Sequence, residues 1–243
     1  MHIIKLSATA STNDDLRNYV KDMQPQQPTV LWTPHQFQGK GQAGNVWHSA
    51  PNENLTFSLY IPDLRLPVGQ SFELNKWVSI ALADWLENHN IPEIQIKWPN
   101  DILSGQKKIG GILIESSISN GQVQPHAIGV GINVNQSNFL DLPNATSMSL
   151  QTEKNFDIEK LVVSCAQAIV NVLKSPLDSC TSRYLERLYG LQKLGKFSQN
   201  GVSFEGVIEG VQTDGRLTIQ TEDKQLLFAP KTLKFVHISD QSF

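Results

Sequence analysis

Two adjacent lysines, Lys107 and Lys108, lead into an apolar, strand-like run that contains the pair Gly110-Gly111. A lysine that points inward from a strand is costly unless its ammonium meets an anion, and paired glycines let a flat apolar ligand lie against the backbone. Residues 97–101, Lys-Trp-Pro-Asn-Asp, place another lysine, an amide and a carboxylate at the end of a nearby strand. These residue types indicate a site for an anionic ligand; a charged hairpin tip beside a closely packed strand is the alternative.

A glycine-rich loop precedes this region in the chain. Residues 39–44, Gly-Lys-Gly-Gln-Ala-Gly, match the G-x-G-x-x-G pattern of dinucleotide-binding folds. That pattern requires a helix to begin at the glycines, so that the helix N-terminus meets the pyrophosphate. Residues 45–54 contain Pro51, show no apolar periodicity and are too few for a crossover helix before the next strand. The sequence therefore argues against a nicotinamide-dependent oxidoreductase and leaves a mobile surface loop, or a loop that closes over a phosphate or carboxylate.

A third glycine-containing segment, residues 129–135, runs along a predicted strand into Asn133 and Asn135. Asparagine amides there can bind a ligand, although asparagine at a strand end is more often a turn former. The six histidines are scattered and no Cys-x-x-Cys occurs, so we expect no structural metal site. Cys165 and Cys180 lie in helix-like stretches and do not make a disulfide framework, so the expected location is a reducing cytoplasm.

The elements that position these residues follow from hydrophobic periodicity. Residues 11–14, Ser-Thr-Asn-Asp, predict a helix start with a capping box, a hydroxyl followed three residues later by an acid. A helix with one buried face is predicted at residues 72–90. A hairpin is predicted around Asn120-Gly121, which is a strong turn signal. The remaining strands of this part are predicted at residues 2–6, 29–33, 55–61 and 94–98, and those of the hairpin at 109–118 and 123–134.

The C-terminal part of the chain differs in character. A helix predicted at residues 158–173 and another just after it, indicated by Tyr184, Leu185 and Leu188, are followed from about residue 195 by short β-type runs with Asn-Gly and Asp-Gly turns between them. We therefore expect a domain boundary near residue 190. The larger domain is predicted at residues 1–190, and a small antiparallel β domain, a barrel or a sandwich, at residues 191–243.

The composition is that of a globular protein. The 243 residues are 40% hydrophobic and 18% charged, with a formal net charge of -3. A nearly neutral chain argues against a broad role on nucleic acid or membrane surfaces. No apolar run approaches the roughly 18 residues of a membrane-spanning helix, and the N-terminal residues lack the apolar stretch of a signal peptide.

The motifs together resemble the catalytic domain of biotin–protein ligases. The resemblance rests on Ser11-Thr12-Asn13, on Gln36 with the glycine-rich loop and Trp47, and on residues 97–101, 108–113 and 129–135, in the family's order. It implies an α+β fold, in which a mixed sheet with flanking helices is like the catalytic core of class II aminoacyl-tRNA synthetases. The β tail is similar to the family's C-terminal SH3-like barrel.

The resemblance also implies a reaction. The carboxylate of biotin attacks the α-phosphate of ATP, and biotinyl-5′-adenylate and diphosphate form; a specific lysine of a biotin carboxyl carrier protein then takes the biotinyl group. Because both reactants of the first step are anions, fixed cations are the main requirement. Lys108 is the candidate catalytic residue, bridging biotin and the α-phosphate, with Lys40 and Lys97 as further cations. We expect Mg²⁺ to arrive with ATP rather than in a protein cage.

Two sets of binding residues follow from the resemblance. The ureido ring of biotin offers donors and an acceptor that a buried site must answer, whereas its bicycle and valeryl chain need an apolar groove. The expected biotin-binding residues are Ser11, Thr12, Asn13, Gln36, Lys40, Gly41, Gln42, Lys108, Gly110 and Gly111. The expected nucleotide-binding residues are Gly39, Lys40, Trp47, Lys97, Asn100, Asp101, Lys108 and Asn133.

Two loop positions depart from the family's pattern. Gln42 and Asn45 stand where many relatives carry arginine. Glutamine can form hydrogen bonds but cannot neutralise phosphate charge. We therefore expect ordinary chemistry with weaker retention of the adenylate, which would be visible as leakage or self-biotinylation.

The expected partner is a biotin carboxyl carrier protein, by resemblance that of acetyl-CoA carboxylase, with the chain a monomer or a homodimer and no membrane partner. Because the first motif begins at Ser11, no DNA-binding helix-turn-helix and no operator binding are expected. Two alternatives are a lipoate–protein ligase of the same architecture and a non-catalytic module that binds biotin or the carrier. Residues 97–101 favour biotin, and Lys108 beside the glycine pair favours catalysis.

Overall fold

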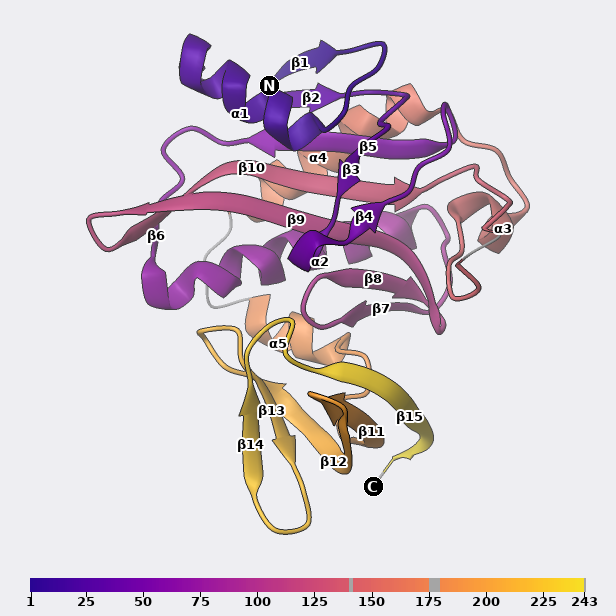
Figure 1. Ribbon diagram of the computed structural model, residues 1–243. Helices are drawn as coiled ribbons and strands as arrows, with labels where there is room; N and C mark the ends of the chain where they lie inside the picture. Colours follow the sequence, from indigo (N-terminus) through magenta and orange to yellow (C-terminus); the bar gives the residue numbers. More distant parts are fainter. Residues whose placement is uncertain (140–141, 175–179, 243) are drawn as a thin grey trace.

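The computed structural model describes residues 1–139, 142–174 and 180–242, except for the side chains of residues 240–242. Within these residues, Figure 1 shows a large mixed sheet and, below it, a smaller antiparallel sheet. The large sheet has eight strands in the described residues, of which β6 (Leu66–Pro67) pairs only with β10. The other seven lie in the order β1 (His2–Lys5), β2 (Thr29–Trp32), β5 (Asn54–Tyr60), β10 (Gln122–Asn133), β9 (Lys107–Ser119), β8 (Asp101–Ser104) and β7 (Ile94–Lys97).

Pairing in the large sheet is antiparallel except between β1 and β2, which run parallel. β9 and β10 form a long hairpin, and its turn residues Asn120 and Gly121 have φ angles of 51° and 71°. Left-handed φ at both central residues is what a two-residue type I′ turn requires, and Asn-Gly adopts it readily. The predicted hairpin is therefore confirmed, and it carries Lys108 and the glycines into the middle of the sheet.

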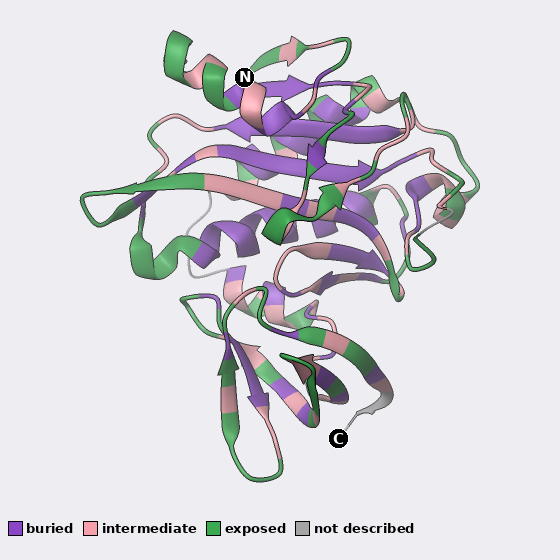
Figure 2. Cartoon of the chain, in the orientation of Figure 1, coloured by how far each residue is buried: buried purple, intermediate pink, exposed green. Residues whose placement is uncertain are grey.

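Helices cover both faces of the large sheet (Figure 1). α1 (Thr12–Met23) packs on β2, β5 and β10 in front of it, whereas α2 (Ser71–Asn88) and α4 (Ile158–Val172) pack against each other behind it. α2 is buried along most of its length (Figure 2), because the sheet, α4 and α5 (Cys180–Glu186) surround it. Cys165 of α4 and Cys180 of α5 are both buried as thiols.

The smaller sheet contains five strands in the described residues. Their order is β14 (Gln225–Phe228), β13 (Leu217–Gln220), β12 (Val202–Val211), β11 (Lys193–Gln199) and β15 (Lys234–Ser242), and all neighbours are antiparallel. The end strands β14 and β15 are not paired with each other within the described residues. The predicted fold class, a mixed sheet with flanking helices and a small C-terminal β unit, is confirmed.

The two sheets contribute to one hydrophobic core. The same cluster of buried side chains includes Phe57 of the large sheet and Phe197 of the smaller one. Trp98 donates its indole Nε1–H to the carbonyl oxygen of Gly215 at 2.9 Å, and the Phe72 ring lies against the same glycine. A division into residues 1–190 and 191–243 stays a prediction, because the core continues across that boundary.

Some features of the local structure differ from the sequence-based predictions. Ser11 is the N-cap residue of α1, but its side chain makes no capping hydrogen bond, so the predicted capping box is wrong. Sequence patterns do not predict the strands β8, β11 and β15, because polar residues interrupt the apolar alternation of these strands. They also do not predict the short helix α3 (Met148–Thr152). Among the described residues, no helix is long and apolar enough to cross a bilayer.

Candidate active site

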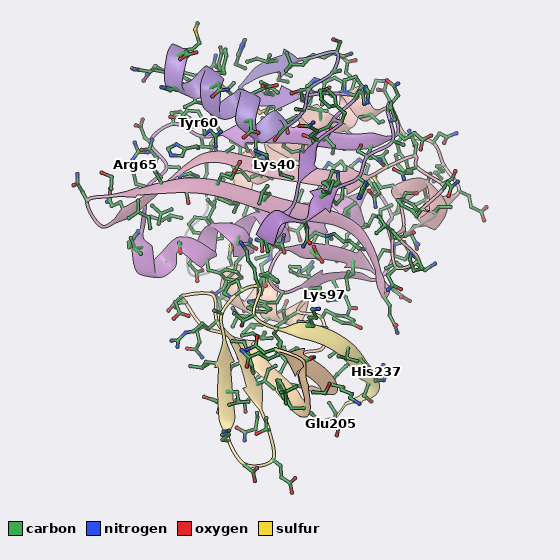
Figure 3. The ribbon with its side chains drawn as sticks, in the orientation of Figure 1. Lys40, Tyr60, Arg65, Lys97, Glu205 and His237 are labelled. Carbon is green, nitrogen blue, oxygen red and sulfur yellow. The ribbon has the colours of Figure 1, made fainter. Side chains whose placement is uncertain are left out.

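A cavity of about 170 Å³, which we name the first cavity, lies between the start of α1, the glycine-rich loop and the β9–β10 hairpin. Lys40, which lines it, is labelled in front of the large sheet in Figure 3. The predicted biotin-binding residues that line it are Ser11, Thr12, Asn13, Gln36, Lys40, Gly41, Gln42, Lys108 and Gly111. The structure therefore brings together residues that lie up to a hundred positions apart in the sequence.

One end of the first cavity holds a buried polar network. Gln36 Oε1 accepts hydrogen bonds from the backbone N–H of Thr12 at 2.9 Å and from Thr12 Oγ1 at 3.1 Å. The Ser58 hydroxyl, from β5, lies 2.8 Å from Thr12 Oγ1 and 2.5 Å from Asn13 Oδ1. The network fixes the orientation of these side chains, and Ser11 lies beside them with 3% of its surface exposed. This end can therefore present several donors and acceptors to a polar ring.

Glycines on β9 and β10 form a floor without side chains. Gly111, Gly129 and Gly131 line the first cavity. A Cβ atom at Gly129 would lie 2.5 Å from Asn13 Oδ1, and one at Gly131 would lie 2.5 Å from Cε2 of the Trp47 indole. Larger residues at these positions would push the polar network and the indole away from the sheet. The floor therefore lets a flat group approach the backbone closely.

Gly110 has a different role from its neighbour Gly111. It does not line the first cavity, and a Cβ atom there would meet the Ile132 side chain and would lie 3.0 Å from the carbonyl oxygen of Gly131. Successive residues of a strand point to opposite faces of the sheet. The structure therefore corrects the predicted pair: Gly111 faces the cavity, whereas Gly110 is needed for packing on the other face.

The glycine-rich loop folds as a small hairpin. β3 (Gly39–Lys40) pairs with β4 (Val46–Trp47) across a 3₁₀ turn at Gln42–Gly44. Residues 45–54, all of them described, contain no helix, which confirms the argument against a dinucleotide-binding motif. Gly39 does not line the first cavity. A Cβ atom there would lie 2.5 Å from the carbonyl oxygen of Trp47, so the glycine is needed for the close approach of β3 and β4 in the hairpin.

Lys108 lies where two cavities adjoin. Its Nζ is 2.6 Å from Asp101 Oδ1 and 5.7 Å from the centre of the Trp47 ring. Lys108, Asp101 and Trp47 line both the first cavity and a second cavity of about 660 Å³. The ion pair is partly exposed, with 38% of the Lys108 side chain and 27% of the Asp101 side chain accessible. The ammonium is therefore held in place yet remains accessible to ligands.

The second cavity lies between the large sheet and β15. Lys97, Lys107 and Asn133 line it from the large sheet, and Tyr189, Phe235 and His237 line it from the C-terminal part. Figure 3 labels Lys97 between the two sheets and His237 on the smaller one. Lysines at one wall and aromatic rings at the other can accommodate a ligand that is both anionic and aromatic.

Lys97 is the second cation of this region. Its Nζ lies 5.2 Å from the centre of the Phe235 ring. Burial lowers the pKa of the Lys97 ammonium below its ordinary value; the nearby Lys108 acts in the same direction, and Asp101 acts against it. A half-buried ammonium beside a second lysine is stabilised by an anion that enters between them.

Two predicted nucleotide-binding asparagines bind the backbone. Asn100 Nδ2 donates to the carbonyl oxygen of Ile112 at 2.8 Å, and Asn133 Nδ2 donates to that of Thr146 at 2.9 Å. Asn100 lines the first cavity and Asn133 lines the second. Their roles in nucleotide binding stay predictions, whereas their hydrogen bonds to the backbone are structural.

Unpartnered polar atoms mark the first cavity as a binding site. Gln42 Oε1 and Trp47 Nε1 are buried without a hydrogen-bond partner in the described residues. Buried polar atoms nearly always have partners, and both residues line the first cavity. Among the described residues, no three or more His, Cys, Asp or Glu side chains are grouped to hold a metal ion. Gln42 Oε1 can accept a hydrogen bond from a group that enters the first cavity, and Trp47 Nε1 can donate one to it.

Several residues of the candidate site have little or no signal in the sequence. Ser58 interrupts an apolar strand, and this polar position is the one sign that could have indicated it. Glu115 accepts a hydrogen bond from Asn13 Nδ2 at 2.8 Å across a separation of 102 residues. Phe235 and His237 reach the second cavity only because the smaller sheet packs below the large one. Such contacts depend on the tertiary fold.

The fold is that of the biotin protein ligases. The structure of biotin protein ligase from Aquifex aeolicus in complex with biotin and ATP is similar, with a TM-score of 0.77 and 23% sequence identity. The similarity covers 98% of this chain and 99% of that one.

The sequence defines the family itself. Residues 6–133, more than half of the chain, match the model of the Biotin/lipoate A/B protein ligase family. The chain belongs to this family. It is 32% identical over 162 residues to the bifunctional ligase/repressor BirA of Bacillus spizizenii, which is 64% of this chain and 49% of that protein. It is 30% identical over 151 residues to the biotin--[acetyl-CoA-carboxylase] ligase of Mycobacterium tuberculosis, 59% of this chain and 53% of that protein. The chain thus spans about half the length of these relatives.

Proposed function

We propose that the chain is an ATP-dependent biotin–protein ligase. The position of Lys108 carries the proposal, because its side chain lines both cavities at the place where they adjoin. A reaction between two anions needs a fixed cation at the point where they meet. Membership of the family, and the names of the relatives, support the same assignment.

Biotin would occupy the first cavity. The network of Thr12, Asn13 and Gln36 offers the ureido ring both donors and acceptors, which a buried ligand of this kind requires. The glycine floor suits the apolar bicycle and valeryl chain. The carboxylate would then point toward Lys108 and the second cavity. The orphaned Gln42 Oε1 and Trp47 Nε1 provide a further acceptor and donor.

ATP would occupy the second cavity, with its α-phosphate toward Lys108. Lys97 and Lys107 supply positive charge for the phosphates, and Tyr189 and Phe235 supply aromatic surface for the base. Mg²⁺ would enter with the nucleotide, held mainly by phosphate oxygens and water. Asp101 is the carboxylate nearest to both cavities, but its ion pair with Lys108 makes orientation of the ammonium its first role.

In the first step, a carboxylate oxygen of biotin bonds to the α-phosphorus of ATP. The bond between that phosphorus and the bridging oxygen breaks, and diphosphate leaves with the electron pair. Lys108 reduces the repulsion between the two reactants and stabilises the negative charge that develops on the α-phosphate oxygens. The product, biotinyl-5′-adenylate, is a reactive acyl phosphate, and the hairpin of residues 39–47 is placed to shield it from water.

In the second step, the uncharged amine of a carrier lysine attacks the acyl carbon. The bond from this carbon to the phosphate oxygen breaks, AMP leaves, and an amide remains after the amine loses its proton to solvent. A free lysine has a pKa of about 10.4, so deprotonation precedes attack. We assign no side chain as the base; docking of the carrier supplies orientation, which alone gives a large rate gain.

The test is biotin-dependent exchange of labelled diphosphate into ATP. We expect Lys108→Ala to lower the exchange rate by about two orders of magnitude or more, because a fixed charge at the reacting centre is lost. Lys154→Ala is the matched control, since Lys154 is exposed on the loop after α3. Circular dichroism checks that both variants are folded. An unchanged exchange rate in Lys108→Ala would contradict the role proposed here.

The same assay separates the alternatives. Exchange that depends on lipoate and not on biotin would assign the chain to the lipoate branch of the family. Biotin binding without any exchange would indicate a non-catalytic module. Residues 97–101 favour biotin, as the sequence indicates.

The proposed acceptor is the biotin carboxyl carrier protein of acetyl-CoA carboxylase, as the name of the Mycobacterium tuberculosis relative suggests. The absence of operator binding and the choice between monomer and homodimer stay predictions. A gel-shift assay with operator DNA tests the first, and sedimentation equilibrium with and without biotin and ATP tests the second.

A further inference from the structure

A third cavity, of about 540 Å³, lies away from the proposed active site. It is formed by the C-terminal half of α1, the segment after β5 and the first half of β10. Figure 3 labels Tyr60 and Arg65 in this region, beside α1 and to the left of Lys40. None of the residues that line this cavity lines the first or the second one. The proposed ligase reaction therefore makes no use of it.

Tyr60 brings a hydroxyl group to the third cavity. Only 8% of the residue is exposed, but its hydroxyl, which makes no hydrogen bond to any residue that the structure describes, is accessible to solvent. The ring packs in a small core with Leu16 and Leu31, and the residue also lines the third cavity. The hydroxyl of Tyr60 is therefore placed to donate to a ligand in the cavity.

Charged residues give the third cavity a positive character. Arg17 and Lys21 lie four residues apart on α1 and so share one face of the helix, and both line the cavity. Arg65 does not line the cavity; its Nη1 donates to the backbone carbonyl oxygen of Leu64 at 2.9 Å. Two carboxylates oppose them: Asp63 lines the cavity, and Asp14 pairs with Arg17 at 3.1 Å. Lys21 forms no ion pair within the part of the chain that the structure describes, so its ammonium is available to an anion.

The strand that forms the floor is shaped locally. The register between β9 and β10 shifts between Pro125 and Ala127, which places a β-bulge at His126. A bulge turns a side chain away from the regular alternation, and bulges are frequent beside binding sites. His126 and Gln124 both line the third cavity. Donors from α1, β5 and β10 thus converge from three directions.

We propose that the third cavity binds a phosphoryl dianion, as inorganic phosphate or a phosphomonoester. Guanidinium, ammonium and phenolic donors that converge from separate elements match the several oxygens of a tetrahedral anion better than the two oxygens of a carboxylate. The proposal does not depend on the ligase activity, because it rests on residues outside both cavities of the proposed active site.

The experiment is a titration of the whole chain with inorganic phosphate at constant ionic strength, followed by calorimetry and by ¹⁵N–¹H NMR shifts. We expect saturable binding, with shifted amide signals at Lys21, Gln124 and His126. Tyr60→Phe and Lys21→Gln are each expected to weaken binding by about ten-fold, because each removes one hydrogen bond to a charged group. Tyr19→Phe and Lys154→Gln are the matched controls, since neither residue lines the third cavity, and both should bind phosphate as the parent chain does.

Four outcomes would overturn the proposal. The first is no saturable binding, and the second is equal binding by Tyr60→Phe and the parent chain. The third is acetate binding as tightly as phosphate, which would reject the phosphoryl class. Circular dichroism of the Tyr60→Phe variant reports whether the fold is intact, so a misfolded variant is not mistaken for loss of the site. Amide shifts confined to the first or second cavity would also contradict it.

Discussion

Asp101 determines where the Lys108 ammonium lies, because the two side chains are 2.6 Å apart. We predict that Asp101→Asn lowers the exchange rate by about ten-fold, less than Lys108→Ala, since the charge of Lys108 remains but its orientation is lost. Adding Asp101→Asn to Lys108→Ala should cost nothing further, because residues that act together are non-additive. Steady-state values of kcat and of KM for ATP and biotin measure both effects.

The control for this variant is Asp214→Asn. Asp214 also forms an ion pair, with Arg216 Nε at 2.7 Å, but it lies in the turn between β12 and β13 and lines neither cavity. We expect this variant to keep the parent exchange rate. A parent-like rate in Asp101→Asn, or fully additive losses in the double variant, would exclude the positioning role.

Gly129 and Gly110 test which face of the hairpin meets the ligand. We predict that Gly129→Ala raises the KM for biotin by about ten-fold, because its Cβ would displace the Asn13 amide, 2.5 Å away. Gly110→Ala should instead lower the free energy of unfolding by about 1–3 kcal/mol, because its Cβ would overpack against Ile132. Urea titration and biotin saturation curves separate the two; a shared phenotype would refute the assignment of faces.

Gln42 tests how the loop retains the adenylate. Its Oε1 is buried without a partner in the described residues, and its side chain carries no charge. We predict that Gln42→Arg slows release of labelled biotinyl-adenylate several-fold, because a cation is added beside the phosphate. Self-biotinylation should fall in parallel. Gln38→Arg, in the same loop but outside the lining of the first cavity, is the control, and equal leakage from Gln42→Arg and the parent would reject the idea.

At the scale of elements, the sequence predicts those whose signals are local. The β9–β10 hairpin follows from Asn120-Gly121, because that turn chemistry acts within two residues. β8 is only four residues long, Asp101–Ser104, and its one apolar pair gives no periodicity. Apolar and polar residues alternate only weakly along β15, where Phe235 both lines the second cavity and packs against the core. The motifs of the first cavity were thus recognisable from sequence, whereas the wall of the second cavity depends on packing between sheets.

β15 contributes to the nucleotide side of the proposed site through Phe235, whose ring lies 5.2 Å from Lys97 Nζ. We predict that Phe235→Leu raises the KM for ATP about two- to five-fold and leaves the KM for biotin unchanged, because it removes a cation–π contact from one cavity only. Phe204→Leu is the control, since Phe204 packs against Phe197 and Phe228 within the sheet. Equal changes in both KM values would assign Phe235 a general structural role.

At the scale of the whole molecule, the proposed site is completed by segments that lie far apart in the chain. The first cavity uses α1 and the β9–β10 hairpin, and the second adds β15. The smaller sheet is therefore both a wall of the proposed nucleotide site and part of the common core. A change in its packing should alter nucleotide binding before it alters biotin binding.

The shared core also determines how the chain unfolds. Phe57, Leu82 and Phe197 belong to one buried cluster, and Trp98 is bonded to Gly215 across the sheets. We predict a single calorimetric transition with equal calorimetric and van't Hoff enthalpies, because units that share a core lose it together. A fragment of residues 1–190 should bind a hydrophobic dye and lack biotin-dependent exchange, because its surface toward the smaller sheet is apolar. Two resolved transitions, or a stable and active fragment, would instead establish residues 1–190 as an independent domain.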